Sequence, residues 1–244
     1  MPDFVNTSTQ LPSEATDLTQ LQSQLESGSE KMQLQALAQL IAADVPGQQV
    51  IQSFLQSRQQ QGLAVTFVEG RAYELLLQVD RPEVQSFLAH HFTQGVVSLR
   101  SEAGIDYEPL QQRLAAQDFL EADRLTLQKL CELAGDTAIR RKWVYFTEVE
   151  SFPAIDLQTI DALWSVHSEG KFGFRVQRQL WLSVGKNWDI LWPKINWKAD
   201  KAWTRYPDGF TWDLSAPRGH LPLSNQLRGV QTFNALLNHP AWTT

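Results

Sequence analysis

The sequence lacks several features that would define common protein classes. It has a single cysteine, Cys131, so no internal disulfide bond and no cysteine-based zinc site can form. Its longest apolar runs, such as residues 64–68, are far shorter than the roughly 18 residues that a membrane-spanning helix needs. The N-terminus is acidic and polar, without the basic and then apolar order of a secretory signal. We therefore expect a cytoplasmic protein in a reducing compartment.

The sequence also lacks an excess of basic over acidic residues. Residues 1–95 contain ten acidic and four basic residues, a net charge of −6, whereas residues 96–244 contain seventeen of each. A domain that binds nucleic acid normally has a clear basic excess, so nucleic-acid binding is disfavoured. The glycines at residues 170–173 lack the spacing of a phosphate-binding loop, and the five histidines include no pair at helical spacing. We expect no nucleotide site, no metal of its own and no resident cofactor.

What the sequence does contain is tryptophan. It has nine tryptophans, and all of them lie between Trp143 and Trp242. Tryptophan offers a large flat apolar face and one N–H donor, so a cluster builds either a core or a surface that binds something flat. Trp164, Trp181 and Trp188 fall on helix-like segments and are predicted to belong to the core.

The first part of the chain has the pattern of short amphipathic helices. Residues 1–15 lack periodicity and are predicted to form a tail. Residues 16–93 are predicted to form an N-terminal bundle of five helices, with breaks near residues 27–29, at Pro46–Gly47, near residues 61–62 and near residues 80–82. Such a bundle resembles one or two turns of a helical repeat solenoid. Residues 94–106 are predicted to be a linker.

Residues 107–244 are predicted to form a mostly helical, loop-rich core domain, which makes the whole chain all-α. Asp118 is expected to begin a long helix, with Glu121 as its capping partner. Further helices are expected near residues 107–116, 156–166, 174–184, 187–192 and 224–238. Residues 193–224 contain four prolines and read as a long irregular segment. Long loops within compact domains are usually functional.

Few residues suggest catalysis. Glu148 and Glu150 are two residues apart, so on a strand they would share one face, as a carboxylate pair or as a solvated strand edge. Cys131 lies on an apolar helix stripe and is interpreted as a buried thiol rather than a nucleophile. Two functional alternatives remain open at this point: a hydrolase that uses the two glutamates in a tryptophan-lined cleft, and a helical protein-interaction adaptor.

Aromatic and basic side chains alternate in two segments, residues 140–146 and 203–218. An apolar bowl rimmed by arginines suits a large flat ligand with acidic edges, because ring faces stack and guanidinium groups pair with carboxylates. Arg124 lies inside the apolar stripe of its helix. It is either a residue of such a rim or part of an ion pair with a neighbouring acid.

The same segments resemble a known family. GIDYEPL at residues 104–110, EADR at 121–124, WVYF at 143–146, WTRYPDGFTWDL at 203–214, GHLPL at 219–223 and LRG at 227–229 are similar to the genomes-uncoupled-four family, over roughly residues 104–242. The resemblance implies a non-enzymatic protein that binds protoporphyrin IX and magnesium protoporphyrin IX. It also implies stimulation of magnesium chelatase in chlorophyll biosynthesis, with the large porphyrin-binding subunit of the chelatase as partner. An N-terminal helical bundle is found in the bacterial-type members.

The resemblance further implies a cupped, all-helical core under loops, one of which corresponds to residues 194–224. Trp203 would stack on the porphyrin or gate it, and Arg124 and Arg228 would meet its propionates. His220 is the best candidate to approach a bound magnesium, with a hydrogen-bonding role in the loop as the other interpretation. A peripheral association with photosynthetic membranes stays open. The full set of expected porphyrin-binding residues is Arg124, Trp143, Phe146, Trp203, Arg205, Phe210, Trp212, Arg218, Asn225 and Arg228.

Overall fold

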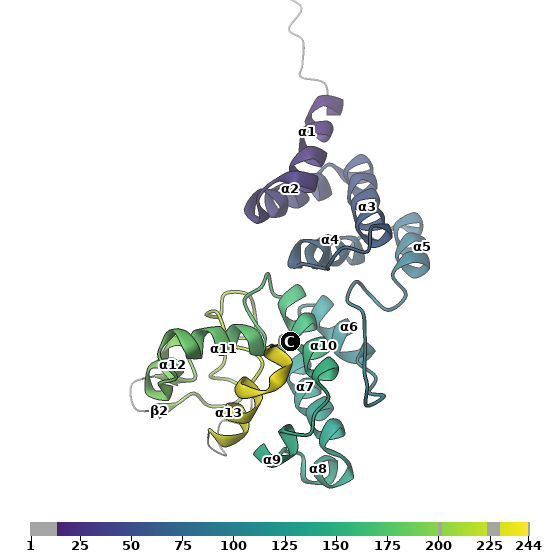
Figure 1. Ribbon diagram of the computed structural model, residues 1–244. Coiled ribbons are helices and arrows are strands. Elements are labelled where there is room, and N and C mark those ends of the chain that lie inside the picture. The colour runs from purple at the N-terminus through teal and green to yellow at the C-terminus, as the bar shows by residue number, and fades with distance from the viewer. Residues whose placement is uncertain (1–13, 200–201, 224–229, 244) are drawn as a thin grey trace, which may run out of the picture. The chain divides into compact units, whose positions relative to one another are not determined.

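The computed structural model describes residues 14–199, 202–223 and 230–243. These residues form thirteen α-helices, one 3₁₀ helix and a hairpin of two short strands (Figure 1). The prediction of an all-α chain is therefore confirmed. The chain divides into two compact units. One holds the described residues up to Leu63 together with Leu75–His91, and the other holds Ala64–Glu74 and the residues from Phe92 onward.

The division runs through a helix, α4 (Phe67–Leu77), whose first part belongs to the second unit and whose last part belongs to the first. The domain boundaries expected from the sequence, at residues 93 and 106, stay a prediction.

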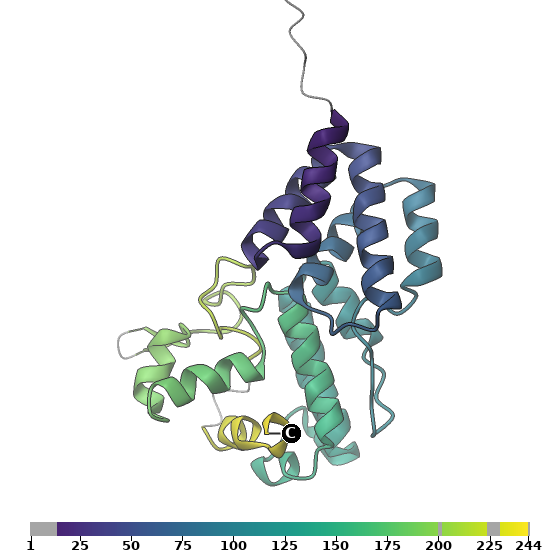
Figure 2. The same cartoon turned by 45° about the horizontal axis from the view of Figure 1, so that its top comes forward.

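The first unit is built from amphipathic helices around a leucine-rich core. Its helices are α1 (Glu14–Ser27), α2 (Glu30–Ala42), α3 (Asp44–Gln60) and α5 (Pro82–His91). Ser29 caps α2, because its side chain accepts a hydrogen bond from the backbone N–H of Met32. Figure 2 shows α3 and α5 side by side. Leu25, Leu37 and Leu40 are fully buried in this unit.

The connection between α2 and α3 differs from the expectation that Pro46–Gly47 ends a helix. The structure begins α3 at Asp44, so Pro46 lies in the first turn, where its missing N–H removes no intrahelical hydrogen bond. A Cβ atom on Gly47 would lie 1.8 Å from the carbonyl oxygen of Leu40. Glycine at this position therefore lets α2 and α3 pack closely.

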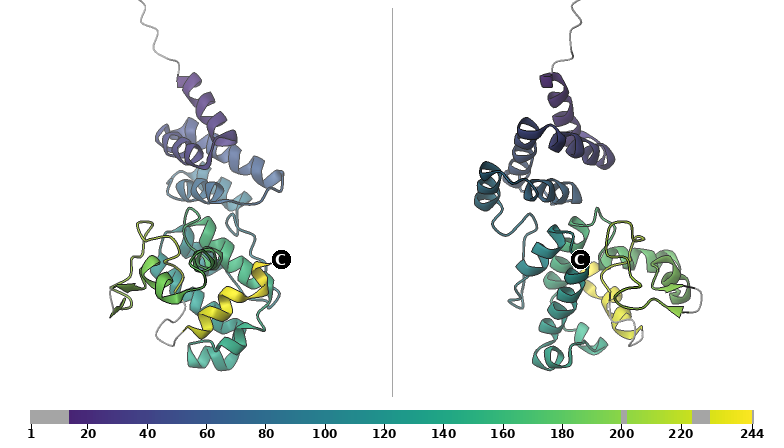
Figure 3. Two further views of the ribbon diagram at one scale, coloured as in Figure 1. Left: turned by 60° about the vertical axis from the view of Figure 1, so that its left-hand side comes forward. Right: turned by 180° about the vertical axis from the view of Figure 1, so that it is seen from behind.

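The second unit contains the tryptophans. Its elements after α4 are α6 (Glu108–Ala115), α7 (Phe119–Ala134), α8 (Asp136–Arg141), α9 (Phe146–Val149), α10 (Ala154–Val166), α11 (Phe174–Ser183), α12 (Trp188–Lys194), β1 (Lys198–Ala199), β2 (Ala202–Trp203), α13 (Gln231–Asn238) and η2 (Pro240–Trp242). Two of these, α8 and α9, were not expected from the sequence, because they are only six and four residues long. Figure 3 shows α13 in yellow, which packs against α9 and α11.

Helix α7 is amphipathic and begins where the sequence predicts. The carboxylate of Asp118 caps it by accepting a hydrogen bond from the N–H of Glu121, at 3.3 Å. Its inner face buries Phe119, Ala122 and Leu130. The other side of the helix carries Arg124 and Gln128, which are exposed. One helix therefore serves both the core and the surface of this unit.

Four indole rings form a continuous stack, which we call the tryptophan stack (Trp181, Trp188, Trp192 and Trp197). Successive ring centroids are 4.9, 5.0 and 5.6 Å apart, and the last pair is nearly parallel, at 8°. Phe233 of α13 packs against three of the four rings. Trp164 is fully buried, Trp181 is buried and Trp188 is half-buried, so their predicted core role is confirmed.

The described part of the irregular segment after β2, residues 204–223, contains no helix or strand and is held by hydrogen bonds. The amide of Gln177 donates to the carbonyl oxygens of Gly219 and Pro222, at 3.0 and 2.9 Å. The indole N–H of Trp197 donates to the carbonyl oxygen of His220 at 2.7 Å. Buried backbone groups need such partners, so these side chains fix the path of the segment.

The tryptophan stack predicts a large stability cost when one of its rings is removed. We expect Trp192→Ala to lower the free energy of unfolding by about 3–5 kcal/mol, because a buried aromatic is lost and a cavity remains. The measurement is urea unfolding followed by circular dichroism. Ile190 lies on the same helix and is 52% exposed, so Ile190→Ala is the matched control, with an expected change of less than about 0.5 kcal/mol. Equal losses in the two variants would show that the stack does not stabilise the fold.

Candidate binding pocket

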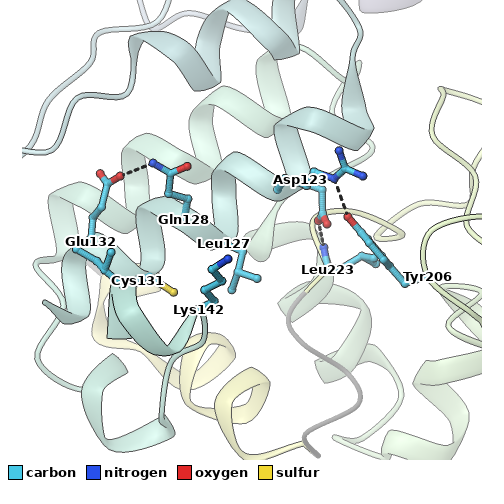
Figure 4. A pocket seen from close by; sticks show the side chains of 10 residues that line it. Asp123, Leu127, Gln128, Cys131, Glu132, Lys142, Tyr206 and Leu223 are labelled. Carbon is cyan, nitrogen blue, oxygen red and sulfur yellow. Dashed lines mark hydrogen bonds between the residues drawn. The ribbon is translucent and has the colours of Figure 1, made fainter. Parts of the chain in front are cut away.

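A cavity of about 590 Å³ lies beside α7 in the second unit. This volume is within the range of about 300–1,000 Å³ that is typical of small-molecule sites. The described residues that line it are Asp123, Arg124, Leu127, Gln128, Cys131, Glu132, Ile139, Lys142, Tyr206 and Leu223 (Figure 4).

Helical spacing brings most of these residues to the cavity. Asp123, Leu127 and Cys131 recur every four residues, so they lie on one side of α7. Ile139 comes from α8, and Lys142 is its left-handed C-cap, with φ of +61°. The irregular segment supplies the remaining wall. The cavity therefore depends on α8, which was not expected from the sequence, and on a segment about a hundred residues away from Asp123.

The walls are mostly apolar, and two basic residues belong to the lining. Leu127, Cys131 and Leu223 contribute apolar surface, whereas Arg124 and Lys142 are exposed to solvent. This combination suits a ligand with an apolar body and anionic groups at its edge.

Both roles considered for Arg124, a rim residue and a partner in an ion pair, agree with the structure, because Arg124 lines the cavity and also pairs with Glu121. Its Nε donates to the hydroxyl of Tyr206 at 3.3 Å, and its Nη1 lies 3.3 Å from Oε2 of Glu121. The ion pair is exposed and contributes little to stability. Its guanidinium therefore has one partner on α7 and one on the irregular segment.

Asp123 is buried on the wall of the cavity. Its carboxylate accepts a hydrogen bond from the backbone N–H of Leu223 at 2.6 Å, which joins α7 to the end of the irregular segment. Burial raises the pKa of Asp123 from 3.8 to about 7, against the opposing effects of the Leu223 N–H and of Arg124. This carboxyl therefore changes its charge near neutral pH.

Cys131 also faces the cavity, but it is not chemically activated. Its side chain is buried, and burial raises the pKa of its thiol to about 11. The thiolate is the nucleophilic form of cysteine, and it is scarce at neutral pH here. The interpretation of Cys131 as a buried thiol is confirmed.

The structure places Trp143 and Phe146 at the N-terminal side of α9. The guanidinium carbon of Arg141 lies 4.4 Å from the ring centroid of Trp143, and Tyr145 packs against the same ring. Phe146 is 39% exposed. Neither residue is among the described residues that line the cavity.

Three further expected residues lie on the exposed surface and outside this lining. Trp203 is 40% exposed and contacts the tryptophan stack edge-on, with its ring centroid 5.5 Å from that of Trp192. Arg218 donates to the side-chain oxygen of Gln179 at 2.8 Å. Arg205 is exposed in the irregular segment.

Phe210 and Trp212 pack behind the cavity wall instead of lining it. The ring centroid of Trp212 lies 5.8 Å from that of Tyr206, and its indole N–H donates to the carbonyl oxygen of Pro207. Phe210 is buried, and its ring centroid lies 5.4 Å from that of His220. Trp212 therefore supports the lining residue Tyr206. The remaining expected residues, Asn225 and Arg228, lie outside the described residues.

His220 has a hydrogen-bonding role in the irregular segment. Its Nδ1 lies 2.7 Å from the carbonyl oxygen of Ile195, and its Nε2 accepts from the N–H of Thr211 at 3.2 Å. Burial lowers the pKa of this histidine, so the neutral ring is favoured. Of the two interpretations of His220, the structure supports the hydrogen-bonding one, because both ring nitrogens are occupied.

The expected strand at Glu148 and Glu150 is wrong. Glu148 lies in α9, where its carboxylate accepts from the N–H of Tyr145 at 2.7 Å and from Arg141 at 2.6 Å. Glu150 is the exposed C-cap of that helix. Neither carboxylate lines the cavity. Glu148 is thus explained by helix capping and ion pairing, and the hydrolase alternative loses its catalytic pair.

Two features are absent from the described part of the chain. Residues 14–199, 202–223 and 230–243 contain no group of three or more His, Cys, Asp or Glu side chains that could hold a metal ion. No helix within these ranges is long and apolar enough to cross a membrane.

Most of the residues that line the cavity were not predicted from the sequence. One signal was present: helical periodicity from Arg124 predicts that Leu127, Gln128 and Cys131 share its side of the helix. A second signal is Asp123 itself, a carboxyl at a position within the apolar stripe of this helix. For Tyr206 and Leu223 no local signal exists, because the irregular segment reaches α7 only through tertiary contacts.

Fold and cavity together define a helical protein with an apolar ligand pocket in its second unit. Comparison with known proteins makes the class specific. Residues 100–240 match the family model described as GUN4-like, and residues 9–93 match the ARM-like repeat domain found at the N-terminus of GUN4. The chain belongs to the GUN4, or genomes-uncoupled-four, family, which confirms the resemblance in its motifs.

Named relatives agree with this assignment. The Ycf53-like protein of Synechocystis sp. is 50% identical over 93% of this chain and 97% of its own length. The chloroplastic tetrapyrrole-binding protein of Arabidopsis thaliana is 38% identical over 59% of this chain and 57% of its own. The structure of GUN4 from Chlamydomonas reinhardtii has a TM-score of 0.57 and 42% identity, and it covers 61% of this chain and 95% of that chain.

The buried Asp123 predicts a pH dependence of stability. Between pH 3.8 and about 7 the folded protein holds more protons at Asp123 than the unfolded chain does, so the free energy of unfolding falls as the pH rises through this range. Asparagine cannot ionise and can still accept from Leu223. We expect wild type to lose up to about 4 kcal/mol more than Asp123→Asn across this window, as measured by urea unfolding near both ends.

Glu150→Gln is the control for this measurement, because Glu150 is an exposed carboxylate at the C-cap of α9. Its loss of stability with pH should match that of wild type. If Asp123→Asn instead follows wild type, the ionisation of Asp123 does not destabilise the fold.

Proposed function

We propose that this protein is a non-enzymatic tetrapyrrole-binding regulator that binds protoporphyrin IX and magnesium protoporphyrin IX and stimulates magnesium chelatase in chlorophyll biosynthesis. The observation that carries the proposal is an apolar cavity with exposed cations in its lining, in a chain whose Arabidopsis relative is named a tetrapyrrole-binding protein. The porphyrins are cargo in this proposal, and the protein holds no cofactor or metal of its own.

The chemistry of the cavity supports a porphyrin as ligand. A protoporphyrin is a planar apolar ring with two propionates on one edge. Leu127, Ile139 and Leu223 offer apolar contacts to such a ring, and Arg124 and Lys142 offer cations to its propionates. We retain Trp203 as a stacking or gating residue and Arg228 and Asn225 as candidates near a propionate.

The role in the chelatase reaction follows from binding alone. A protein that binds the substrate or the product of the enzyme can change flux without catalysing a step, either by presenting porphyrin or by removing product. We propose the large porphyrin-binding subunit of magnesium chelatase as the partner. We propose that the protein acts in the cytoplasm, and a peripheral association with photosynthetic membranes belongs to the same proposal.

For the domains, we propose a tail at residues 1–15, a helical bundle at 16–93, a linker at 94–106 and a porphyrin-binding core at 107–244. The matches of the two family models to residues 9–93 and 100–240 support this organisation. The alternatives lack support: the glutamates of the hydrolase hypothesis do not line the cavity, and a pure adaptor would have no pocket.

Narrowing the cavity is expected to weaken porphyrin binding. Leu127→Trp adds a large side chain to the cavity wall without burying a charge, and we expect at least about a tenfold weaker affinity for deuteroporphyrin IX. Quenching of tryptophan fluorescence gives the dissociation constant. Leu182→Trp is the matched control, because Leu182 is 39% exposed on α11 and is not among the lining residues. If micromolar ligand does not quench the fluorescence of wild type, the proposed function is wrong. If Leu127→Trp keeps the affinity of wild type, the binding site lies outside this cavity.

The same pair of variants tests the regulatory role. Wild type and Leu182→Trp should increase the rate at which purified magnesium chelatase forms magnesium deuteroporphyrin, and Leu127→Trp should not. The rate is measured from the fluorescence of the product. If all three proteins stimulate the chelatase equally, its activation does not depend on the cavity.

A further inference from the structure

The cavity contains a carboxyl group that the proposed function does not use. Asp123 is 5% exposed, and Figure 4 shows its side chain directed towards Leu223. An anionic side chain on the wall of a pocket for an anionic ligand is unexpected, because two negative charges in a medium of low dielectric constant repel each other.

Neighbouring charges do not neutralise this carboxyl. The guanidinium of Arg124 is directed to Tyr206 and Glu121, and within the described residues Asp123 has one hydrogen bond, from the Leu223 N–H, and no ion pair. The other charged or titratable groups that line the cavity are Cys131 and Glu132 on α7, Lys142 at the end of α8 and Tyr206 on the irregular segment.

The surroundings of these groups differ. Lys142 is exposed, Glu132 is paired with Lys129 at 2.9 Å, and burial raises the pKa of the Cys131 thiol to about 11. The carboxyl of Asp123 is buried without an ion pair among the described residues, and burial brings its pKa to about 7. A small change in its surroundings therefore decides whether it carries a charge.

We propose that Asp123 is a specificity-determining residue that makes the pocket take up one proton together with an anionic ligand. This inference rests on the proposed function, since the anionic groups are the propionates of the porphyrin. When the ligand enters, it removes water from the cavity and brings negative charge towards Asp123, and both effects favour the neutral carboxyl. The proton comes from solvent and stays on the Asp123 carboxyl, where it leaves the hydrogen bond from Leu223 in place.

The proposal fixes the sign of a pH dependence. Where Asp123 is ionised in the free protein, binding must take up a proton, so affinity falls as the pH rises, by at most about tenfold per pH unit. Where Asp123 is already protonated, affinity does not depend on this group. An uncharged porphyrin brings no anion to the cavity and should depend on pH less steeply.

The experiment measures the dissociation constant of deuteroporphyrin IX and of its dimethyl ester between about pH 6 and pH 9. We expect the affinity of wild type for the diacid to fall above neutral pH, with a shallower slope for the diester. Asp123→Asn keeps the acceptor for Leu223 and cannot ionise, so its affinity for the diacid should be independent of pH and higher than that of wild type at the alkaline end.

A control variant separates Asp123 from other buried carboxyl groups. Asp161 is also buried, with a pKa raised to about 6, but its carboxylate accepts a hydrogen bond from the backbone N–H of Arg175 and does not line the cavity. Asp161→Asn should keep the pH slope of wild type.

Calorimetry on the wild-type protein gives a test that does not depend on any variant. Titration of the diacid at about pH 8, in buffers with different ionisation enthalpies, should reveal uptake of nearly one proton per ligand. Binding without proton uptake, or a slope that persists in Asp123→Asn, would overturn the proposal. Affinity that rises with pH would also overturn it, because the carboxylate would then attract the ligand. Absence of binding at every pH would instead contradict the proposed function.

Discussion

The second unit depends on hydrogen-bond partners for the buried backbone groups of a long irregular segment. The described residues between α12 and α13 contain little regular structure, so their buried N–H and C=O groups need other partners. Gln177 of α11, Asp123 of α7 and the indole of Trp197 supply those partners. Because the same segment carries Tyr206 and Leu223, these bonds also determine the wall of the cavity. Stability of the fold and shape of the pocket therefore rest on the same side chains.

Helix α7 combines two tasks that usually fall to different elements. Its inner face packs Phe119 and Leu130 into the core, and its outer side presents Arg124 and Leu127 to the cavity. Asp123 lies between the two, buried like a core residue and yet part of the lining. A carboxyl in this position holds the irregular segment and at the same time responds to what enters the cavity, which joins the stability of the protein to its ligand chemistry.

Much of the fold was predictable because it is local, and much of the pocket was not. Amphipathic periodicity and the Asp118 cap located α7, whereas α8 and α9 are too short to show a period. Arg124 could be placed at the cavity because a base within an apolar stripe is conspicuous. For Phe210 the family resemblance left two roles open, lining the bowl or anchoring the loop, and only tertiary packing shows that it is buried against His220. Tyr206 and Leu223, which bond to α7 from the irregular segment, lie 82 and 100 residues along the chain from their partners, where no spacing rule applies.

The lone thiol has a practical consequence. Cys131 is the chain's one cysteine and lies on the cavity wall, so a thiol-specific reagent that reacts with the folded protein reports on this wall. Its high pKa makes that reaction slow, and a ligand that covers the wall would slow it further. The protein therefore carries its own chemical probe of pocket occupancy, with no competing thiol elsewhere in the sequence to obscure the signal.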